Sequence, residues 1–299
     1  MAHVTRPHPY DGFKQPFTVG LLPLDLADWI EPDGMLGAHL AEKERLFALN
    51  ETAVFRAQED TVEAQREVLA LLLCHLPRRF PHLYEADTNS IRVIPTGARY
   101  RKDDWSEAPL KLAALLVQED LVIMRKGENA YRLAAAALCF PSSWSLAEKF
   151  GQEMPAIHDN VPGFNDARMG RIVARIFETL NIDTPVWRLN WSLYGDGELH
   201  HPSPKSLDAR VAGSNQELFV RVERQTLRRL PQSADILFTI RIHHDPLSAF
   251  AAHPDGARLA KGLRQQLLAL DADQLAYKGL TRQRDSIAQR LERLAETLA

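Results

Sequence analysis

The period of the hydrophobic pattern changes near residue 120, and this change constrains the fold more than any other feature of the sequence. Before it, apolar residues recur at helical spacing, most clearly over residues 51–75, where we expect a helix that follows Asn50 and ends at Pro77. A further short helix is expected over residues 106–119. From residue 120 onwards, apolar and polar residues alternate with a period of two, which is typical of β-strands.

The alternating segments predict a sheet that is interrupted once by helices. The first two flank a Gly-Glu-Asn turn at residues 127–129, which predicts a hairpin. Helical sequence follows, with an apolar stripe over residues 166–180. The five expected strands span residues 120–126, 131–140, 186–194, 217–229 and 235–243. Five antiparallel strands with helices inserted after the second are the arrangement of a PAS domain, so the predicted fold class is α+β.

We expect three regions along the chain. Residues 1–119 would form a proline- and aromatic-rich arm, over about the first 35 residues, followed by helices, and the arm would lie extended over the body. Residues 120–250 would form the PAS-like domain with its pocket. Residues 251–299 would form C-terminal helices packed on that body, so that the sheet is wrapped by helices from both ends of the chain.

The composition argues against several classes of function. The sequence has 36 Lys and Arg against 39 Asp and Glu, a formal net charge of −3, which favours neither nucleic acid nor a membrane as partner. No apolar run is long enough for a membrane helix, and the first residues lack a signal core, so we expect a cytoplasmic protein. Cys74 and Cys139 lie in apolar stretches and are expected to be buried free thiols. With no CxxC or CxxCH motif, zinc, iron–sulfur and covalently attached haem sites are not expected.

The loop at residues 155–163 is the most informative segment for chemistry. It places His158 between two apolar residues and between Pro155 and Pro162, where a PAS core would open over its sheet. Neutral imidazole is the commonest protein ligand for haem iron, and it must approach one face of a flat apolar macrocycle. A core histidine bonded to the backbone is the alternative that the residues alone leave open.

A second unusual feature is an arginine on an apolar strand face. Strict alternation puts Arg224 on the same face as Val220 and Val222, where an unpaired charge is costly. Its partner could be a haem propionate, a bound oxygen species or a structural carboxylate. By the same alternation, we expect Arg188 and Arg241 to contact flanking helices or solvent rather than a cofactor.

The remaining polar candidates are weaker on their own. The pairs His200-His201 and His243-His244 could each lend only one side chain to a site, and loop or strand-end roles are favoured, with His200 or His201 as the alternative haem ligand. Asp166 suits the start of a helix, and Glu198 lies in a loop. The sequence has no GxSxG, GxGxxG, Walker A or HExxH motif, so it shows no flavin or nicotinamide site of its own.

Taken in order, several short motifs resemble the haem-dependent oxidative N-demethylase alpha-subunit family. They are FPSSW at 140–144, KFG at 149–151, IHDNVPG at 157–163, VWRLNWSL at 186–193, RVERQTLRRLP at 221–231 and YKGL at 277–280. The resemblance implies a PAS domain that holds haem b and oxidises a secondary methylamine, with dimethylamine the nearest match, to the demethylated amine and formaldehyde. Dioxygen would be the oxidant, and electrons from NADPH would arrive through separate flavin and iron–sulfur subunits.

Carried onto this sequence, the resemblance makes His158 the axial ligand of the haem iron. It makes Arg224, Asp166 and Glu198 the pocket residues, and Arg224 could stabilise negative charge on bound dioxygen. Dimethylamine is a cation at neutral pH, so one carboxylate, Asp166 or Glu198, should hold it and accept its proton.

Two other functions remain open at the level of sequence. A haem-PAS oxygen or redox sensor would use the same ligand without turnover, and residues 257–299 could then be an output helix, although they lack a sustained heptad repeat. The chain could also be a subunit without cofactor, in which His158 belongs to the core.

Overall fold

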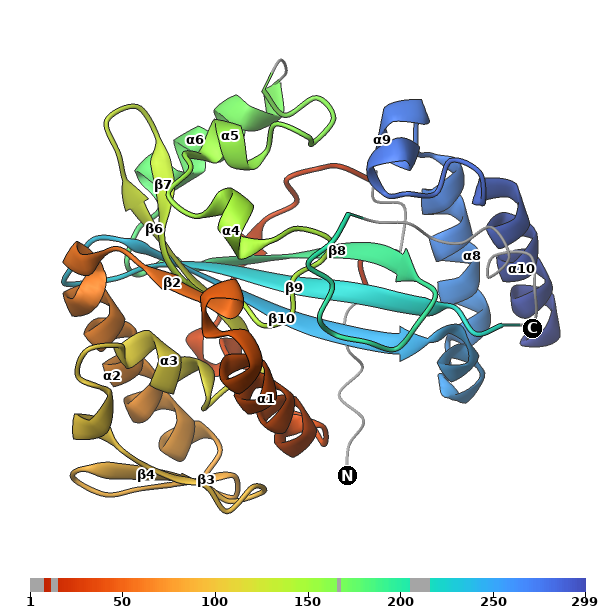
Figure 1. Ribbon diagram of the computed structural model, residues 1–299. Helices are drawn as coiled ribbons and strands as arrows, with labels where there is room; N and C mark the ends of the chain where they lie inside the picture. The colour runs from red at the N-terminus through yellow and green to blue at the C-terminus, as the bar shows by residue number, and fades with distance from the viewer. Residues whose placement is uncertain (1–7, 12–15, 166–167, 205–215) are drawn as a thin grey trace.

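A seven-stranded antiparallel sheet forms the centre of the computed structural model, which describes residues 8–11, 16–165, 168–204 and 216–299 (Figure 1). Its strands lie in the order β1-β8-β9-β10-β6-β7-β2. Their bounds are β1 Leu22–Pro23, β2 Phe55–Ala57, β6 Asp120–Lys126, β7 Tyr131–Ala137, β8 Val186–Tyr194, β9 Phe219–Arg229 and β10 Ile236–Pro246. A separate small sheet contains β3 Tyr84–Ala86, β4 Ser90–Val93 and β5 Arg99–Arg101.

The five strands expected from the alternating pattern are all present, and the α+β class is confirmed. They are β6 to β10, and the predicted hairpin joins β6 to β7. The expectation of a sheet with five strands is wrong, because two short segments of the N-terminal region extend it. β1 pairs with β8 at one edge and β2 pairs with β7 at the other.

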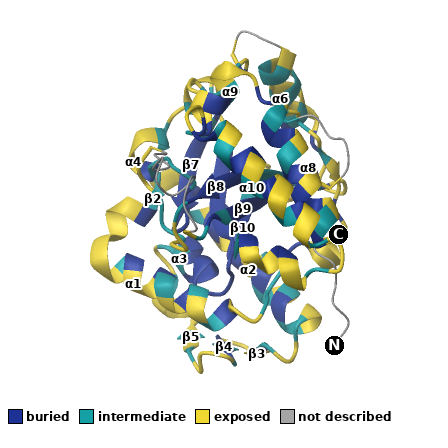
Figure 2. Ribbon diagram, turned by 90° about the vertical axis from the view of Figure 1, so that its right-hand side faces the viewer, coloured by how far each residue is buried: buried dark blue, intermediate teal, exposed yellow. Residues whose placement is uncertain are grey.

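Helices cover both faces of the sheet, and the central strands are buried between them (Figure 2). On one face β6 and β7 pack against α2 and α3, while β8 and β9 pack against α8 and α10. The opposite face carries α4, α5 and α6 (Figure 1). The α-helices are α1 Leu36–Val54, α2 Val62–Arg79, α3 Pro109–Ala114, α4 Leu146–Lys149, α5 Met154–Ile157, α6 Arg168–Thr179, α8 Gly256–Leu268, α9 Ala272–Tyr277 and α10 Arg284–Thr297, and 3-10 helices span Leu26–Asp28, Glu59–Thr61, Lys102–Trp105 and Leu247–Ala252.

The single helix expected over residues 51–75 is wrong. α1 continues through a kink at Asn50, and the chain then extends as β2 to pair with β7 before α2 begins. Pairing with the sheet edge satisfies the backbone there, which local periodicity does not reveal. Pro77 lies inside the last turn of α2 rather than beyond its end.

The cysteines and the membrane-spanning potential of the helices were also considered from the sequence. Both cysteines are free thiols, and Cys139 is buried as predicted, but Cys74 is exposed on α2. None of the helices in the described part of the chain has the length and apolar character that crossing a bilayer requires.

A buried ion pair ties α1 to the sheet. The ammonium group of Lys43 is fully buried, donates to the carbonyl oxygens of Val117 and Glu119 at 2.9 and 2.5 Å, and lies 3.9 Å from the Asp120 carboxylate. Asp120 in turn accepts hydrogen bonds from the backbone of Cys139 and Phe140, both at 2.8 Å. This network fixes the end of the β6–β7 pair, from which the chain runs into α4.

We therefore predict that Lys43→Met destabilises the fold by about 3–5 kcal/mol, because it leaves the buried Asp120 carboxylate without its counter-charge. Chemical denaturation followed by circular dichroism measures the free energy of unfolding. Lys261→Met, on the exposed side of α8, is the control and should change that free energy by less than about 0.5 kcal/mol. A loss below 1 kcal/mol for Lys43→Met would contradict the role given to this pair.

Candidate functional site

A cavity of about 720 Å³ lies between the sheet and α4, α5 and α6. This volume is in the range of small-molecule and cofactor sites. Residues 17–19 and Leu21 of the N-terminal arm also line it. This described part of the arm therefore forms part of the cavity wall.

The lining divides into an apolar part and a polar part. Hydrophobic side chains come from the strands and from the helices above them. They are Val122, Met124, Leu133, Leu227, Phe238 and Ile240 from the sheet, and Met154, Ile157, Val161, Phe164, Met169, Val173, Ile176 and Phe177 from the helical side. The polar part contains Arg188, Asn190, Glu223, Gln225, Tyr277 and Lys278.

His158 lines the apolar part, directly after α5. Its Nδ1 lies 2.9 Å from the carbonyl oxygen of Met154. A carbonyl oxygen can only accept a hydrogen bond, so Nδ1 carries the proton and Nε2 keeps its lone pair. Histidines that bind metals are commonly held by such a bond to the other ring nitrogen.

The surroundings of His158 hold the ring in place and keep it neutral. The imidazole stacks on Phe164 with ring centroids 4.1 Å apart and an angle of 10° between the planes. Burial lowers the pKa of His158 below its ordinary value, and the charges of Lys149 and Arg188 act in the same direction. The neutral form, which is the form that ligates iron, is therefore favoured at neutral pH.

The two prolines explain why the chain turns here. Pro155 occupies the first turn of α5, where a missing N–H costs nothing. Gly163 follows Pro162 with a φ of 69°, a conformation that glycine adopts without strain. The side chain of Asn165 donates to the carbonyl oxygen of Pro155 at 3.1 Å and ties the two ends of the segment together.

These features meet the requirements of a haem site. A haem needs an apolar slot, a neutral imidazole with a free lone pair, and cationic partners for its carboxylates. The cavity supplies the slot, His158 supplies the imidazole, and Arg188 and Lys278 lie in the polar part. The residues present therefore fit the group.

A family model described as haem-dependent oxidative N-demethylase, alpha subunit-like, matches residues 20–288. The chain belongs to this family. The resemblance seen in the sequence motifs is thereby confirmed, and the description of the N-demethylase-like family names a haem dependence and an oxidoreductase activity.

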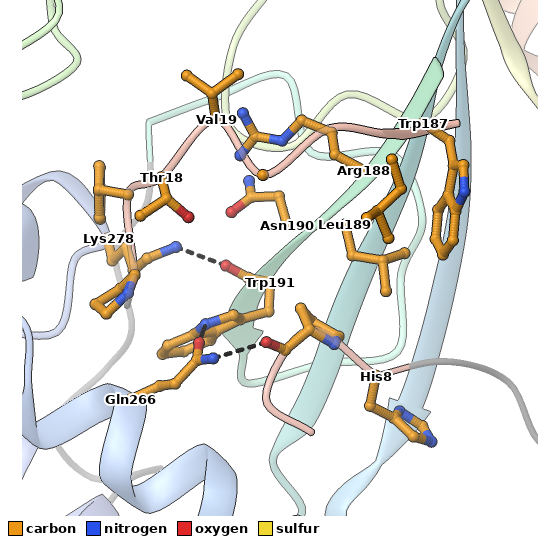
Figure 3. Close-up of a pocket in the computed structure, with 15 residues that line it drawn as sticks. His8, Thr18, Val19, Trp187, Arg188, Leu189, Asn190, Trp191, Gln266 and Lys278 are labelled. Carbon is orange, nitrogen blue, oxygen red and sulfur yellow. Dashed lines mark hydrogen bonds between the residues drawn. The ribbon is translucent and has the colours of Figure 1, made fainter. Parts of the chain in front are cut away.

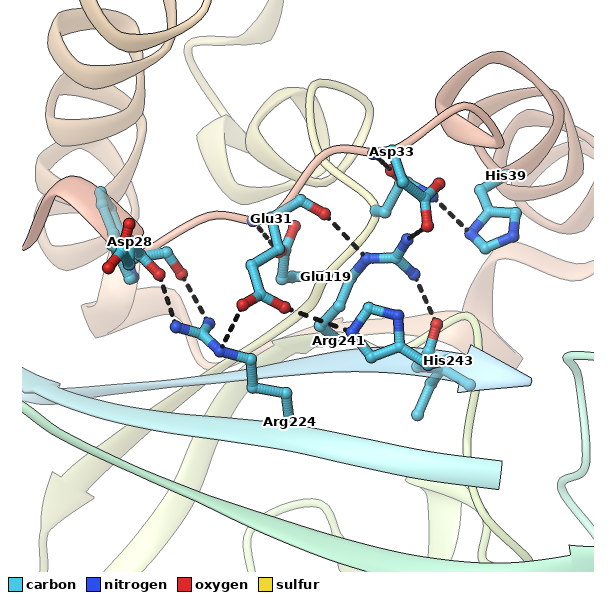
Figure 4. Close-up of polar contacts among 11 residues, drawn as sticks. Asp28, Glu31, Asp33, His39, Glu119, Arg224, Arg241 and His243 are labelled. Carbon is cyan, nitrogen blue, oxygen red and sulfur yellow. Dashed lines mark hydrogen bonds and ion pairs between the residues drawn. The ribbon is translucent and has the colours of Figure 1, made fainter. Parts of the chain in front are cut away.

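The structure places Arg224 away from the cavity of this N-demethylase-like chain (Figure 4). Its guanidinium donates to the carbonyl oxygen of Trp29 at 3.1 Å and to that of Asp28, and its Nε lies 3.0 Å from the Glu31 carboxylate. Of the three partners that the sequence left open, the structure therefore shows the carboxylate. The expectation that Arg224 lies in the pocket is therefore corrected. Successive residues of a strand point to opposite faces of the sheet, and the cavity lies on the face of Glu223 and Gln225.

We expected both Arg241 and Arg188 to contact flanking helices or solvent, but the two side chains lie in different places. Arg241 pairs with Asp33 at 2.7 Å, beside Arg224 and away from the cavity, so its partner is the arm rather than a flanking helix or solvent. Arg188, by contrast, lines the cavity.

Among the described residues, Glu198 and the histidine pairs named from sequence do not gather around His158. Asp166 lies outside the described residues. Glu198 is exposed in the loop after β8, where its carbonyl oxygen accepts a hydrogen bond from His201 at 2.8 Å. His200 is bonded through Nδ1 to the carbonyl oxygen of Cys139 at 2.8 Å and is absent from the described cavity lining. His243 and His244 face opposite sides of β10. His243 contacts the Glu31 carboxylate, and His244 contacts the carbonyl oxygen of Asp196.

Sequence reasoning missed the polar side chains that do line the cavity. Glu223 is 8% exposed, and its carboxylate accepts a hydrogen bond from the Gln225 side chain at 2.7 Å. The signal was present, because alternation puts Glu223 and Gln225 on the face opposite Arg224. The sequence did not reveal which of the two faces borders the cavity.

We predict that His158→Ala abolishes stoichiometric haem binding, because no other imidazole lines the described cavity. His200→Ala is the control, since His200 was the alternative ligand and has a similar hydrogen bond to the backbone. Titration with haem, followed through the Soret band, measures both. Normal haem stoichiometry in His158→Ala, with loss in His200→Ala, would move the ligand to His200.

Proposed function

We propose that this protein catalyses the oxidative N-demethylation of a secondary methylamine, with dimethylamine the favoured substrate and haem b the cofactor. Family membership supports the reaction class. For this chain, the proposal rests on the position of His158. Its Nδ1 is bonded to the backbone, and its Nε2 has no hydrogen-bond partner among the described residues, in the wall of a largely apolar cavity of cofactor size.

The overall reaction converts a secondary amine, O2, NADPH and a proton into a primary amine, formaldehyde, water and NADP⁺. The two electrons would reach this chain through partner subunits that carry flavin and iron–sulfur centres. The description of the family as alpha subunit-like supports such an assembly. The lack of a dinucleotide-binding motif in this sequence supports it as well.

We also propose that residues 120–250 form a PAS-like haem-binding core. Its five strands follow the order β8-β9-β10-β6-β7 in space, which is third, fourth, fifth, first and second along the chain. α4, α5 and α6 are inserted between the second and third of these strands and carry the segment around His158. This arrangement supports the PAS-like interpretation.

The haem supplies the oxygen chemistry when it is bound, and the chain's own residues hold the substrate. Glu223 is the buried carboxylate among the described cavity residues, and we propose that it binds the dimethylammonium cation. The Gln225 side chain holds one carboxylate oxygen and leaves the other free to accept the substrate N–H. Burial raises the pKa of Tyr277 to about 12, so its phenol remains a hydrogen-bond donor at neutral pH.

The other residues named from sequence are weaker candidates than Glu223. Asp166 precedes α6, whose Met169 lines the cavity, so it is the second candidate for holding the amine. Glu198 and Arg224 have the contacts described above and lie outside the described lining. A catalytic role for either would need the loop after β8 or the arm to move.

An aerobic assay across a panel of methylamines tests the function. With haem-loaded protein and a reductant, we expect formaldehyde release that depends on the amine and is greatest for a secondary methylamine. A protein that binds haem but releases no formaldehyde with any amine, although its haem responds to oxygen, would favour the sensor alternative.

Glu223→Gln should lower kcat/KM for dimethylamine by about 10- to 100-fold, the effect of losing a charged hydrogen bond. The loss should appear mainly in KM, with haem content unchanged. Glu148→Gln, at an exposed position of the cavity rim, is the matched control. If Glu223→Gln stays within twofold of wild type while Asp166→Asn loses activity, the amine site belongs to Asp166.

A further inference from the structure

Arg188 is a half-buried cation that has no hydrogen-bond or ion-pair partner among the described residues. It points from β8 into the polar part of the cavity, and its guanidinium makes no hydrogen bond or ion pair with any residue that the structure describes. Its Nε is buried and unsatisfied. Removing part of a charged group from water is costly unless the group is paired, so this arrangement favours an anionic ligand.

Three buried arginines of the same sheet differ from Arg188, whereas half-buried Arg228 likewise has no hydrogen-bond acceptor among the described residues but lies over the ring of Trp29. Arg221 donates to the side chain of Ser142 and to the carbonyl oxygens of Phe140, Pro141 and Leu199. Arg224 and Arg241 each bind a carboxylate and backbone carbonyls of the arm (Figure 4). The fold thus pairs each of these three guanidinium groups with several protein acceptors and leaves that of Arg188 without one.

Lys278 brings a second cation to the same place. Its ammonium group is buried, donates to the carbonyl oxygen of Trp191 at 2.6 Å and lies over the rings of Trp191 and Phe17 (Figure 3). One carbonyl satisfies only part of what an ammonium group can donate. Burial also lowers the pKa of Lys278 to about 8, and a bound anion would raise that pKa again.

The charges at this end of the cavity favour an anionic ligand. Arg188 and Lys278 share it with Glu223, whose charge attracts both but whose carboxylate is bonded to Gln225. Two cations face one carboxylate, and an amine substrate would add a third positive charge. An incoming dianion would satisfy both cations and leave Glu223 available to the amine.

We propose that Arg188, with Lys278 beside it, binds the propionate carboxylates of the haem. This inference rests on the proposed function, which places haem in the cavity. The planar guanidinium suits a carboxylate through paired N–H donors, whereas the ammonium group acts as a point charge. The propionate edge would then face the edge of β8 and residues 17–19 of the arm, away from the apolar lining.

A second, smaller cavity supports this orientation. It has a volume of about 240 Å³, lies between the arm and the edge of β8, and shares Arg188, Asn190 and Lys278 with the main cavity (Figure 3). Carboxylates placed at this shared wall would have polar surroundings on both sides, while the macrocycle would remain among apolar side chains.

Haem dimethyl ester provides the direct test, because both propionates are esterified and carry no charge. Wild-type apoprotein should bind haem more tightly than the ester in Soret titrations without substrate or reductant. Arg188→Met should weaken haem binding by about 10- to 100-fold and leave the affinity for the ester unchanged. Arg188→Lys should recover part of the lost affinity. Arg228→Met is the control, since Arg228 lies on β9 over the ring of Trp29.

The outcomes distinguish failure of the propionate assignment from failure of the proposed function. Equal losses for haem and ester in Arg188→Met, in protein that keeps the wild-type circular dichroism spectrum, would overturn the propionate assignment alone. Unchanged haem affinity with weakened cyanide binding would also overturn it and would place the anion at the iron. A wild-type protein that binds neither pigment would overturn the proposed function itself.

Discussion

The strict alternation of side chains along β8, β9 and β10 is the constraint on which the rest of the structure depends. Each strand sends successive residues to opposite faces, so one face receives Arg224 and Arg241 while the other receives Glu223 and Gln225. The first face is closed by the arm, whose carboxylates neutralise both arginines. The second face is left open beneath α5 and α6, and the cavity forms there.

The cavity lining has an apolar part and a polar part, and this division suits a cofactor and a substrate. At the apolar end, the Met154 carbonyl fixes the tautomer of His158 and leaves one nitrogen available. At the polar end, Arg188 and Lys278 provide positive charge and Glu223 provides negative charge. A flat, largely apolar group with charged substituents matches such a site, and a small cation can still find a carboxylate within it.

Much of the fold and the turn that carries His158 could be predicted from the sequence, because their signals are local. Period-two alternation located all five central strands, and two prolines around His158 marked its loop. The short edge strands β1 and β2 have no pattern of their own, since only pairing with β8 and β7 makes them strands.

The roles of the polar strand residues could not be predicted in the same way. Alternation shows that Arg224 and Glu223 face opposite sides, but the side that becomes a cavity depends on where α5, α6 and the arm pack. The same limit explains why Arg188 was expected outside the site. Its position follows from tertiary contacts between the arm and β8, which are distant in sequence.

The most direct test of the central claim is a crystal structure of the haem-loaded protein with diffraction data collected at the iron absorption edge. We expect one strong anomalous peak inside the cavity, bonded to Nε2 of His158. A peak bonded to any other side chain, or haem bound outside this cavity, would contradict it.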